Sequence, residues 1–455
     1  MSTILPLALF LAAQAAVPQE PPVTTGSERG SAVRLQLSGH LDLHYLHRSS
    51  LIDDAGSSLN GLAPAGGPTD FWSGRIGLRA DIDVKDLVTG VLEIENRSFE
   101  KGMNKPFSAS PPDTAVQIRQ GYIEAGEFLT SQLNLRIGIQ NVTLRNRPQE
   151  EAFFMDLGES EGFFKGFQAG GSFISNTVDR DVGQATGVRL FYSPFEVMTI
   201  QAFWMVYGEG AGTPLGDSVY AVLANSLLAE NWSAWLLFAV VSGQGPQLGE
   251  VGTLGLGVDG YFGDSKELEL FAEGYYQRGT LQHAPTLVRK EAYAFNAGAR
   301  LVPCSCKKFW IEAAFSRRSG DRQSGDNRDQ AFQSYENVNR FLILESAEFG
   351  LDVDSNLDCA RIALGVGPFD VAGRPLRIQA DVGRFTAVTP IQSVVAAGTS
   401  LQWGIESDLA FTWNYNDSFS LSLRGAWLAD SELLRRISTG GNHAWLMVFG
   451  ADLKF

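Results

Sequence analysis

The chain has 455 residues, and its 36 Lys and Arg against 51 Asp and Glu give a formal charge of −15, which argues against binding to nucleic acid through a basic surface. Three cysteines exclude a disulfide-stabilised scaffold, and a hydrophobic content of 44% excludes a disordered chain. The length alone favours two or three soluble domains, but the pattern along the chain indicates one large domain.

The N-terminus predicts an exported chain. Residues 1–15 resemble a signal peptide, because the apolar run 4–12 is too short for a spanning helix and 13–15 form a small-x-small cleavage site. The first three residues lack Lys and Arg, which leaves an apolar tail as the alternative. Residues 16–32 contain several prolines and predict a flexible lead. No later apolar run approaches the ~18 residues of a helical span.

From Val33 onward, apolar and polar residues alternate with the period of a β-strand. Leu35 and Leu37, for example, alternate with Arg34 and Gln36. Many such segments run for 10 to 14 residues, which favours strands that cross a bilayer over the shorter strands of a soluble sandwich. The predicted strands are 33–46, 71–85, 87–99, 115–127, 132–143, 184–193, 197–208, 217–229, 231–242, 251–263, 266–279, 290–302, 308–317, 358–367, 376–386, 400–413, 418–428 and 443–455.

The linkers between these strands differ in length in an ordered way. Those after even-numbered strands are short, whereas those after odd-numbered strands include the long segments 144–183 and 318–357. Outer-membrane barrels have short periplasmic turns and long outer loops. Residues 33–455 therefore predict an all-β fold, a transmembrane antiparallel up-and-down β-barrel of about 18 strands in the lipid of a bacterial outer membrane. Both termini are expected on the periplasmic side.

The C-terminal strand carries the most specific signal. Its apolar residues alternate from Trp445 to the terminal Phe455. A last strand that ends in an aromatic residue resembles the recognition signal of the barrel-assembly machinery, so we expect Phe455 to serve assembly and to face lipid. The alternative is an ordinary soluble C-terminal strand.

The polar phase of the strands is predicted to line a lumen, because closing about eighteen strands leaves room for water. Glu93 and Glu95 are among the acidic residues expected on this phase. Guanidinium groups in one sector could bind carboxylates or phosphates, which predicts a mildly anion-preferring pore. The alternative is that they pair with Asp and Glu of neighbouring strands. The candidate pore-lining residues are Arg75, Arg79, Arg97, Arg119 and Arg136, with Glu159 and Glu161 included if their segment folds onto these arginines.

Each of the two long segments has two possible structural interpretations. Segment 144–183 contains several phenylalanines that need cover from water, either by folding inward to narrow the pore or by packing in an exposed cap. Segment 318–357 contains Asp321, Asp326, Asn327 and Asp329, whose oxygens could hold Ca²⁺ or could simply form a solvated acidic loop. No cofactor is expected.

Three segments resemble the alginate-export family of outer-membrane porins. Residues 71–79 are similar to the family's early strand with spaced arginines, residues 117–123 to its next segment with Gly121 in place of Ala, and residues 135–140 to its Arg-x-Gly-Arg-Gln strand with Ile139 in place of the second Arg. The late loop from Ser319 to Leu357 is also similar. The resemblance implies a monomeric 18-stranded barrel that exports or admits an anionic polysaccharide such as alginate.

We therefore expect a channel for anionic or polar solutes rather than an enzyme, since no local Ser/His/Asp signature is present. The alternatives are an outer-membrane enzyme and a structural or adhesive barrel with a plugged lumen. A plugged lumen would place bulky apolar residues on the inward phase, where the pattern has charges instead.

Overall fold

The computed structural model describes residues 33–49, 70–84, 87–96, 101–102, 116–144, 155–157, 185–207, 217–242, 249–263, 266–283, 286–303, 308–321, 327–334, 340–345, 355–389, 402–437 and 442–455. The predicted signal peptide and lead, Arg97, Glu159 and Glu161 lie outside these residues, as does most of 144–183.

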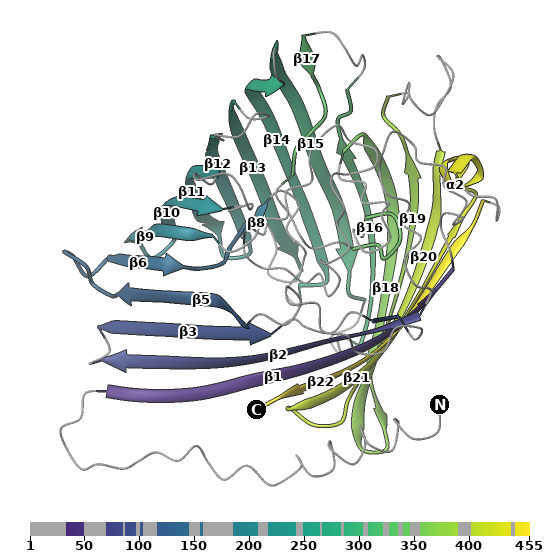
Figure 1. The fold of residues 1–455 in the computed structure, drawn as a ribbon, viewed down its shortest axis with the longest axis horizontal. Helices are drawn as coiled ribbons and strands as arrows, with labels where there is room; N and C mark the ends of the chain where they lie inside the picture. Colours follow the sequence, from purple (N-terminus) through teal and green to yellow (C-terminus); the bar gives the residue numbers. More distant parts are fainter. Residues whose placement is uncertain are drawn as a thin grey trace.

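The long strands of the described residues form one antiparallel sheet that closes on itself (Figure 1). The strands of its wall are β1 (Val33–Arg48), β2 (Asp70–Val84), β3 (Val88–Asn96), β5 (Val116–Ala125), β6 (Leu133–Ile139), β9 (Thr186–Phe195), β10 (Met198–Tyr207), β11 (Asp217–Ala229), β12 (Trp232–Ser242), β13 (Glu250–Phe262), β14 (Leu268–His283), β15 (Thr286–Leu301), β16 (Phe309–Arg318), β18 (Leu357–Val371), β19 (Arg374–Thr386), β20 (Gln402–Asn414), β21 (Phe419–Ala429) and β22 (Ala444–Lys454).

Closure occurs between the first and last strands. β1 pairs with β2 along one edge and with β22 along the other, where His40 lies opposite Lys454. The sheet has 20 strands, and removing the two-residue strands β4 (Lys101–Gly102) and β17 (Arg328–Asp329) leaves a wall of 18. Each backbone group in a closed wall can find a neighbour, which a bilayer requires. The predicted 18-stranded barrel is confirmed.

The connections at the two ends of the barrel differ as the sequence predicts. One end has the short connections 85–87, 126–132, 196–197, 230–231, 263–267, 302–308, 372–373 and 415–418, and the other has connections as long as 319–356. One predicted loop is wrong: 280–289 continues β14 and β15 as a hairpin in which His283 pairs with Thr286. Its alternating residues extend the ladder, so only two residues connect these strands.

Smaller elements complete the described chain. β7 (Val142–Leu144) and β8 (Met155–Leu157) pair with each other apart from the main sheet, and α2 (Glu432–Ile437) precedes β22. No helix of the described ranges is long and apolar enough to cross a membrane.

The two faces of the wall differ in exposure with the period of the strand. Along β12 and β13, Leu236, Phe238, Leu254 and Leu256 are 48 to 59% exposed, while their chain neighbours Leu237 and Thr253 are buried. Exposed apolar side chains that form a continuous belt around a closed sheet are suited to lipid. The exposed alternate side chains of each strand therefore form the outer face of the wall, and the buried ones form the inner face.

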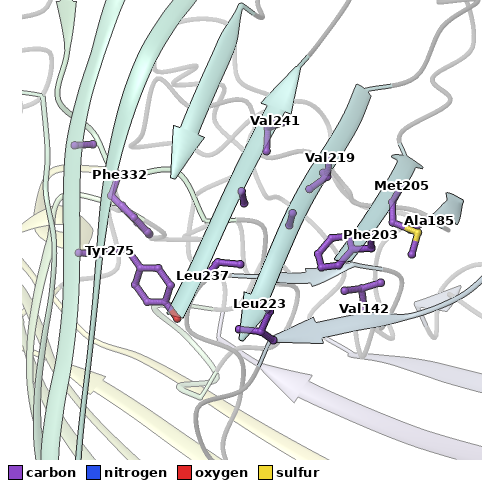
Figure 2. Close-up of a cluster of buried hydrophobic side chains, with 14 residues drawn as sticks. Val142, Ala185, Phe203, Met205, Val219, Leu223, Leu237, Val241, Tyr275 and Phe332 are labelled. Atoms are coloured by element: carbon purple, nitrogen blue, oxygen red, sulfur yellow. The ribbon is translucent and has the colours of Figure 1, made fainter. Parts of the chain in front are cut away.

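One sector of the inner face is apolar (Figure 2). Its cluster contains Val142, Ala185, Phe203, Met205, Val219, Ala221, Leu223, Leu237, Ala239, Val241, Tyr275, Ala292, Ala294 and Phe332. The expectation of charges along the inward phase is therefore wrong for this sector. The physical reason is that β11 and β12 are apolar on both phases, so their inner residues pack together and against Val142 and Phe332 from the connections.

Candidate pore-lining site

Arg79 projects from β2 into a carboxylate pair on the inner face. Its Nε and Nη2 donate to the two oxygens of Asp81 at 2.9 and 2.8 Å, and its Nη1 donates to Glu93 Oε2 at 3.4 Å. Asp81 stands two residues from Arg79, on the same face of β2, and Glu93 lies directly opposite Arg79 on β3. The alternation of the strands thus places all three groups together.

Arg119 of β5 extends this network toward β1. Its Nη1 donates to Glu95 Oε2 at 2.6 Å, and the Glu95 residue is only 2% exposed. His40 Nε2 lies 3.5 Å from the same oxygen and 4.0 Å from Asp42 Oδ2. The hydrogen bond from Arg119 compensates the Glu95 carboxylate for the water that it has lost.

Arg136 of β6 makes a second kind of contact. Its Nε and Nη2 donate to Glu124 Oε2 at 2.8 and 2.5 Å, and its guanidinium lies 4.3 Å from the centre of the Tyr122 ring. Arg189 of β9 lies 4.6 Å from the centre of the Phe191 ring, and its Nη2 donates to Gln201 at 2.5 Å. These rings hold the two neighbouring cations by cation–π contacts.

The structure therefore brings Arg79, Arg119 and Arg136 to one sector of the inner wall, and all three pair with carboxylates. Arg75 lies opposite Asp42 in the register of β1 and β2. The side chain of Arg75 is not among those that the structure describes. The alternation within each strand does not identify Glu124 as the partner of Arg136. The pairing register supplies the signal, since these two residues are directly opposite each other on β5 and β6.

A second charged cluster lies on the inner face of β15 to β20. Glu312, fully buried on β16, accepts hydrogen bonds from Arg300 at 2.9 Å and Arg361 at 2.7 Å. A third guanidinium, that of Arg340, forms an ion pair with Glu312 at an N–O distance of 3.5 Å. Arg300 and Arg361 come from the strands on either side, β15 and β18. Arg340 comes from the connection between β16 and β18.

That connection places residues 340–345, here called the inner strap, against the wall. The backbone N–H groups of Ile343 and Leu344 donate to the carboxylate of Glu406 at 2.6 and 2.9 Å, and Leu342 N–H donates to Asp408 at 3.1 Å. Successive N–H groups aimed at carboxylates form an anion-binding arrangement. Here the two carboxyl groups belong to β20 of the wall.

Side chains fasten the inner strap at both of its ends. Arg340 donates to Asp381 of β19 at 2.9 and 3.0 Å, and Arg318 of β16 lies 3.5 Å from Glu345. Between them, the buried ring of Phe341 meets Phe385 edge to face at 4.8 Å. The strap therefore lies against the inner face of the wall. The sequence pattern suggests narrowing of the pore only for 144–183. The signal within 318–357 was an apolar run flanked by charges, Arg340 to Glu345.

The same connection also folds inward at 327–334. Lys290 of β15, fully buried, donates to Asp329 at 3.0 Å and to the carbonyl of Ala331. Asp329 also accepts from Ala331 N–H at 2.9 Å, so protein donors occupy the carboxylate proposed for Ca²⁺. Asp326 lies outside the described residues, and the described part of the chain contains no group of three or more His, Cys, Asp or Glu suited to a metal ion.

Solved structures with a similar fold come from Pseudomonas aeruginosa and Acinetobacter baumannii. The outer-membrane protein OprD of Pseudomonas aeruginosa aligns with a TM-score of 0.54 over 92% of this chain and 94% of its own, at 11% identity. OccAB2 of Acinetobacter baumannii aligns with a TM-score of 0.55 over 94% of this chain and 99% of its own, at 12% identity. The fold is that of the outer-membrane porins.

The porin fold accounts for the closed wall and for its apolar outer face. The wall, its apolar face and the similarity to these structures place the chain in a bacterial outer membrane. A third structure, OpdQ of Pseudomonas aeruginosa, agrees, with a TM-score of 0.54 over 92% of this chain and 98% of its own at 11% identity. No protein-family model and no curated protein matches the sequence. The resemblance to the alginate-export family gains no support from these comparisons.

Proposed function

We propose that this protein is an outer-membrane channel through which small polar solutes, anionic ones included, diffuse. The proposal rests on the difference in polarity between the two faces of the closed wall. Its outer face is apolar, whereas two sectors of its inner face carry networks of arginines and carboxylates. Such a face holds water and offers hydrogen-bonding partners to a polar solute.

The size limit of this channel is proposed to come from the inner strap. Its backbone is bonded to Glu406 and Asp408, so it stays against the wall and leaves the rest of the lumen to solutes. A single chain is proposed to suffice, because β1 and β22 complete the wall without a second copy. The protein is proposed to transport without catalysis.

Charge selectivity is proposed to be a weak preference for anions that arises near Arg79 and Arg136. Both guanidiniums are already bonded to carboxylates, and a paired cation attracts a passing anion less than a free one. A solute carboxylate can nevertheless exchange with Asp81 or Glu124, because these pairs lie at the lumen surface and are partly exposed. Arg75, Arg97, Glu159 and Glu161 remain candidates for the same sector.

The test is electrical. Purified protein in a planar bilayer should open steady single channels, and the reversal potential across a salt gradient should show a mild anion preference. Arg79→Gln combined with Arg136→Gln should abolish that preference. The matched control is Arg278→Gln with Arg289→Gln, two exposed residues on the outer face of β14 and β15. A cation-selective wild type, or a preference that survives the first pair, would exclude these residues as the selectivity site.

The apolar inner sector favours one competing function, a structural barrel with a plugged lumen. Phe332 and Val142 both cover the inner face of the wall there. The same bilayer measurement separates the two functions, because a plugged barrel produces no steady conductance. Block by short uronic-acid oligosaccharides would then test whether an anionic saccharide enters the lumen.

A further inference from the structure

The first strand of the barrel extends beyond the end of the last strand. Gly39 of β1 exchanges backbone hydrogen bonds with Phe455, the final residue of the chain, at 2.6 and 2.9 Å. The pairing of β1 with β22 ends there, whereas the pairing of β1 with β2 continues to Val33, which lies opposite Val84. Residues 33–38, here called the open edge, therefore have a neighbouring strand on only one side within the described part of the chain.

The backbone groups on the free side of the open edge belong to its odd-numbered residues. In an antiparallel sheet, successive residues of a strand direct their N–H and C=O groups alternately to its two sides. Gly39 directs both of these groups toward β22. Val33, Leu35 and Leu37 therefore direct theirs to the same side, where β22 has already ended, and the even-numbered residues between them face β2.

The side chains of the same odd-numbered residues lie on the outer face of the wall. Leu35 and Leu37 are 62 and 71% exposed, compared with 49 and 41% for Leu78 and Ile82 of the adjacent β2. In lipid, the backbone of the open edge would lack hydrogen-bonding partners. In water, the backbone would be satisfied but the leucines would remain exposed. An added strand with apolar outer residues satisfies the backbone and covers these side chains.

The inner face of the open edge indicates which other residues the added strand should contain. Arg34 is exposed and makes no ion pair with another described residue. On the β2 side, Asp83 lies opposite Arg34, but it accepts a hydrogen bond from Thr89 at 2.8 Å. A carboxylate on the added strand would face Arg34 from the free side, because residues directly opposite each other share one face of a sheet. The open edge therefore fits a strand in which apolar and acidic residues alternate.

The residues that precede the open edge in the chain are a poor match to this pattern. Segment 16–32 contains Pro18, Pro21 and Pro22, which have no N–H group to donate to a sheet. The segment also lacks an alternation of apolar and acidic residues. The added strand is therefore expected to come from another polypeptide.

We propose that an extended segment of a separate periplasmic polypeptide, in which apolar and acidic residues alternate, adds to the barrel as a strand along the open edge of β1. The segment lies antiparallel to β1, in line with β22, and continues the existing seam. This docking site goes beyond the channel function proposed above and does not depend on it. It uses the assignment of the short connections to the periplasm, which the labelling experiment described below tests separately.

The experiment titrates a fluorescent peptide with the sequence of residues 78–84 into the purified protein in neutral detergent and measures Kd by anisotropy. This sequence already pairs with 33–39 on the β2 side, so it has the required alternation. We expect saturable binding that protects the N–H groups of Leu35 and Leu37 from hydrogen exchange. Leu35→Pro removes one N–H of the free side and should weaken binding about tenfold, because a peptide carbonyl loses its donor. Leu35→Ala keeps that N–H and should weaken binding less.

Two matched peptides test the same contact on the unaltered protein, so the result does not depend on assembly of Leu35→Pro. N-methyl groups on the amides copied from Ala80 and Ile82 block the side that bonds to the open edge and should abolish binding. N-methyl groups on the amides copied from Asp81 and Asp83 lie on the opposite side of the peptide and should be tolerated.

Equal affinity of the two methylated peptides, equal affinity of the two Leu35 variants, or a lack of saturable binding would each overturn the site. Protection of Leu35 and Leu37 without added peptide would also overturn it. Loss of that protection after deletion of 16–32 would assign the open edge to the chain's own N-terminal segment, and dependence on protein concentration would assign it to a second copy. Single-channel conductance of Leu35→Pro should equal that of wild type, so a missing channel and a missing docking site are distinguishable results.

Discussion

At the scale of single residues, the Glu312 carboxylate lies among three guanidinium groups of the inner wall. Removing its charge leaves Arg300, Arg361 and Arg340 around a neutral amide in a buried site. We expect Glu312→Gln to lower the free energy of unfolding by roughly 3–5 kcal/mol, as for other buried pairs that lose one partner. Chemical denaturation in detergent or lipid, followed by tryptophan fluorescence, measures this.

The matched control is Glu291→Gln, which removes a carboxylate from an exposed pair. Arg289 and Glu291 are 48 and 36% exposed and their charged atoms are 3.8 Å apart, so the loss should be at most about 1 kcal/mol. Equal effects of the two substitutions would show that Glu312 does not hold its three arginines together.

Gly39 and Phe455 meet at the seam of the barrel. Phe455 exchanges both backbone hydrogen bonds with Gly39, at 2.6 and 2.9 Å, and a Cβ added to Gly39 would lie 2.6 Å from the Phe455 ring. Gly39→Ala should therefore cost about 1–3 kcal/mol through overpacking and reduce the heat-modifiable barrel on gels. Phe455 is 52% exposed at the end of the outward phase, and its role in assembly remains a prediction.

Gly90→Ala is the control for this seam, because its Cβ would approach no atom closer than 3.9 Å. It should assemble normally. Adding Phe455→Ala to Gly39→Ala should relieve part of the clash if the ring causes it. A Gly39→Ala barrel that is as abundant and heat-modifiable as Gly90→Ala would contradict the tight seam.

At the scale of elements, the inner strap depends on acceptors that the wall supplies. Glu406→Ala removes the acceptor of two strap N–H groups, and each such hydrogen bond contributes about 0.5–1.5 kcal/mol. We expect the strap to detach and the single-channel conductance to rise. Glu124→Gln, which removes a carboxylate from a distant part of the wall, should leave the channel size unchanged. Conductance that falls or stays constant in Glu406→Ala would mean that the strap does not limit the pore.

At the scale of the whole molecule, we expect the end with the long connections to face the cell exterior. Single cysteines placed in the connections 49–69 and 319–356, in a variant without the three natural cysteines, should react with an impermeant maleimide on intact cells. Cysteines in 302–308 should react only after the outer membrane is opened, because short connections face the periplasm. Labelling of 302–308 on intact cells would invert the barrel.

Alternation along the strands was enough to predict the architecture. A strand that separates lipid from water must place apolar and polar residues on opposite faces, so residues such as Leu254 and Leu256 predict the outer face without any knowledge of their neighbours. The same rule predicted that Arg79, Arg119 and Arg136 lie on the inner face. It failed for β11 and β12, where both phases are apolar and the pattern no longer distinguishes lipid from a packed interior.

Only the tertiary structure decided what fills and narrows the lumen. The register of β5 and β6 selected Glu124 as the partner of Arg136, and closure of β22 on β1 brought Phe455 onto Gly39. The inner strap reaches Glu406 and Asp408 across more than 60 residues of chain. Periodicity reports which face a side chain occupies within its own strand, because that depends on local backbone geometry. Which distant groups meet depends on pairing register and loop path, and these are set by the whole closed sheet.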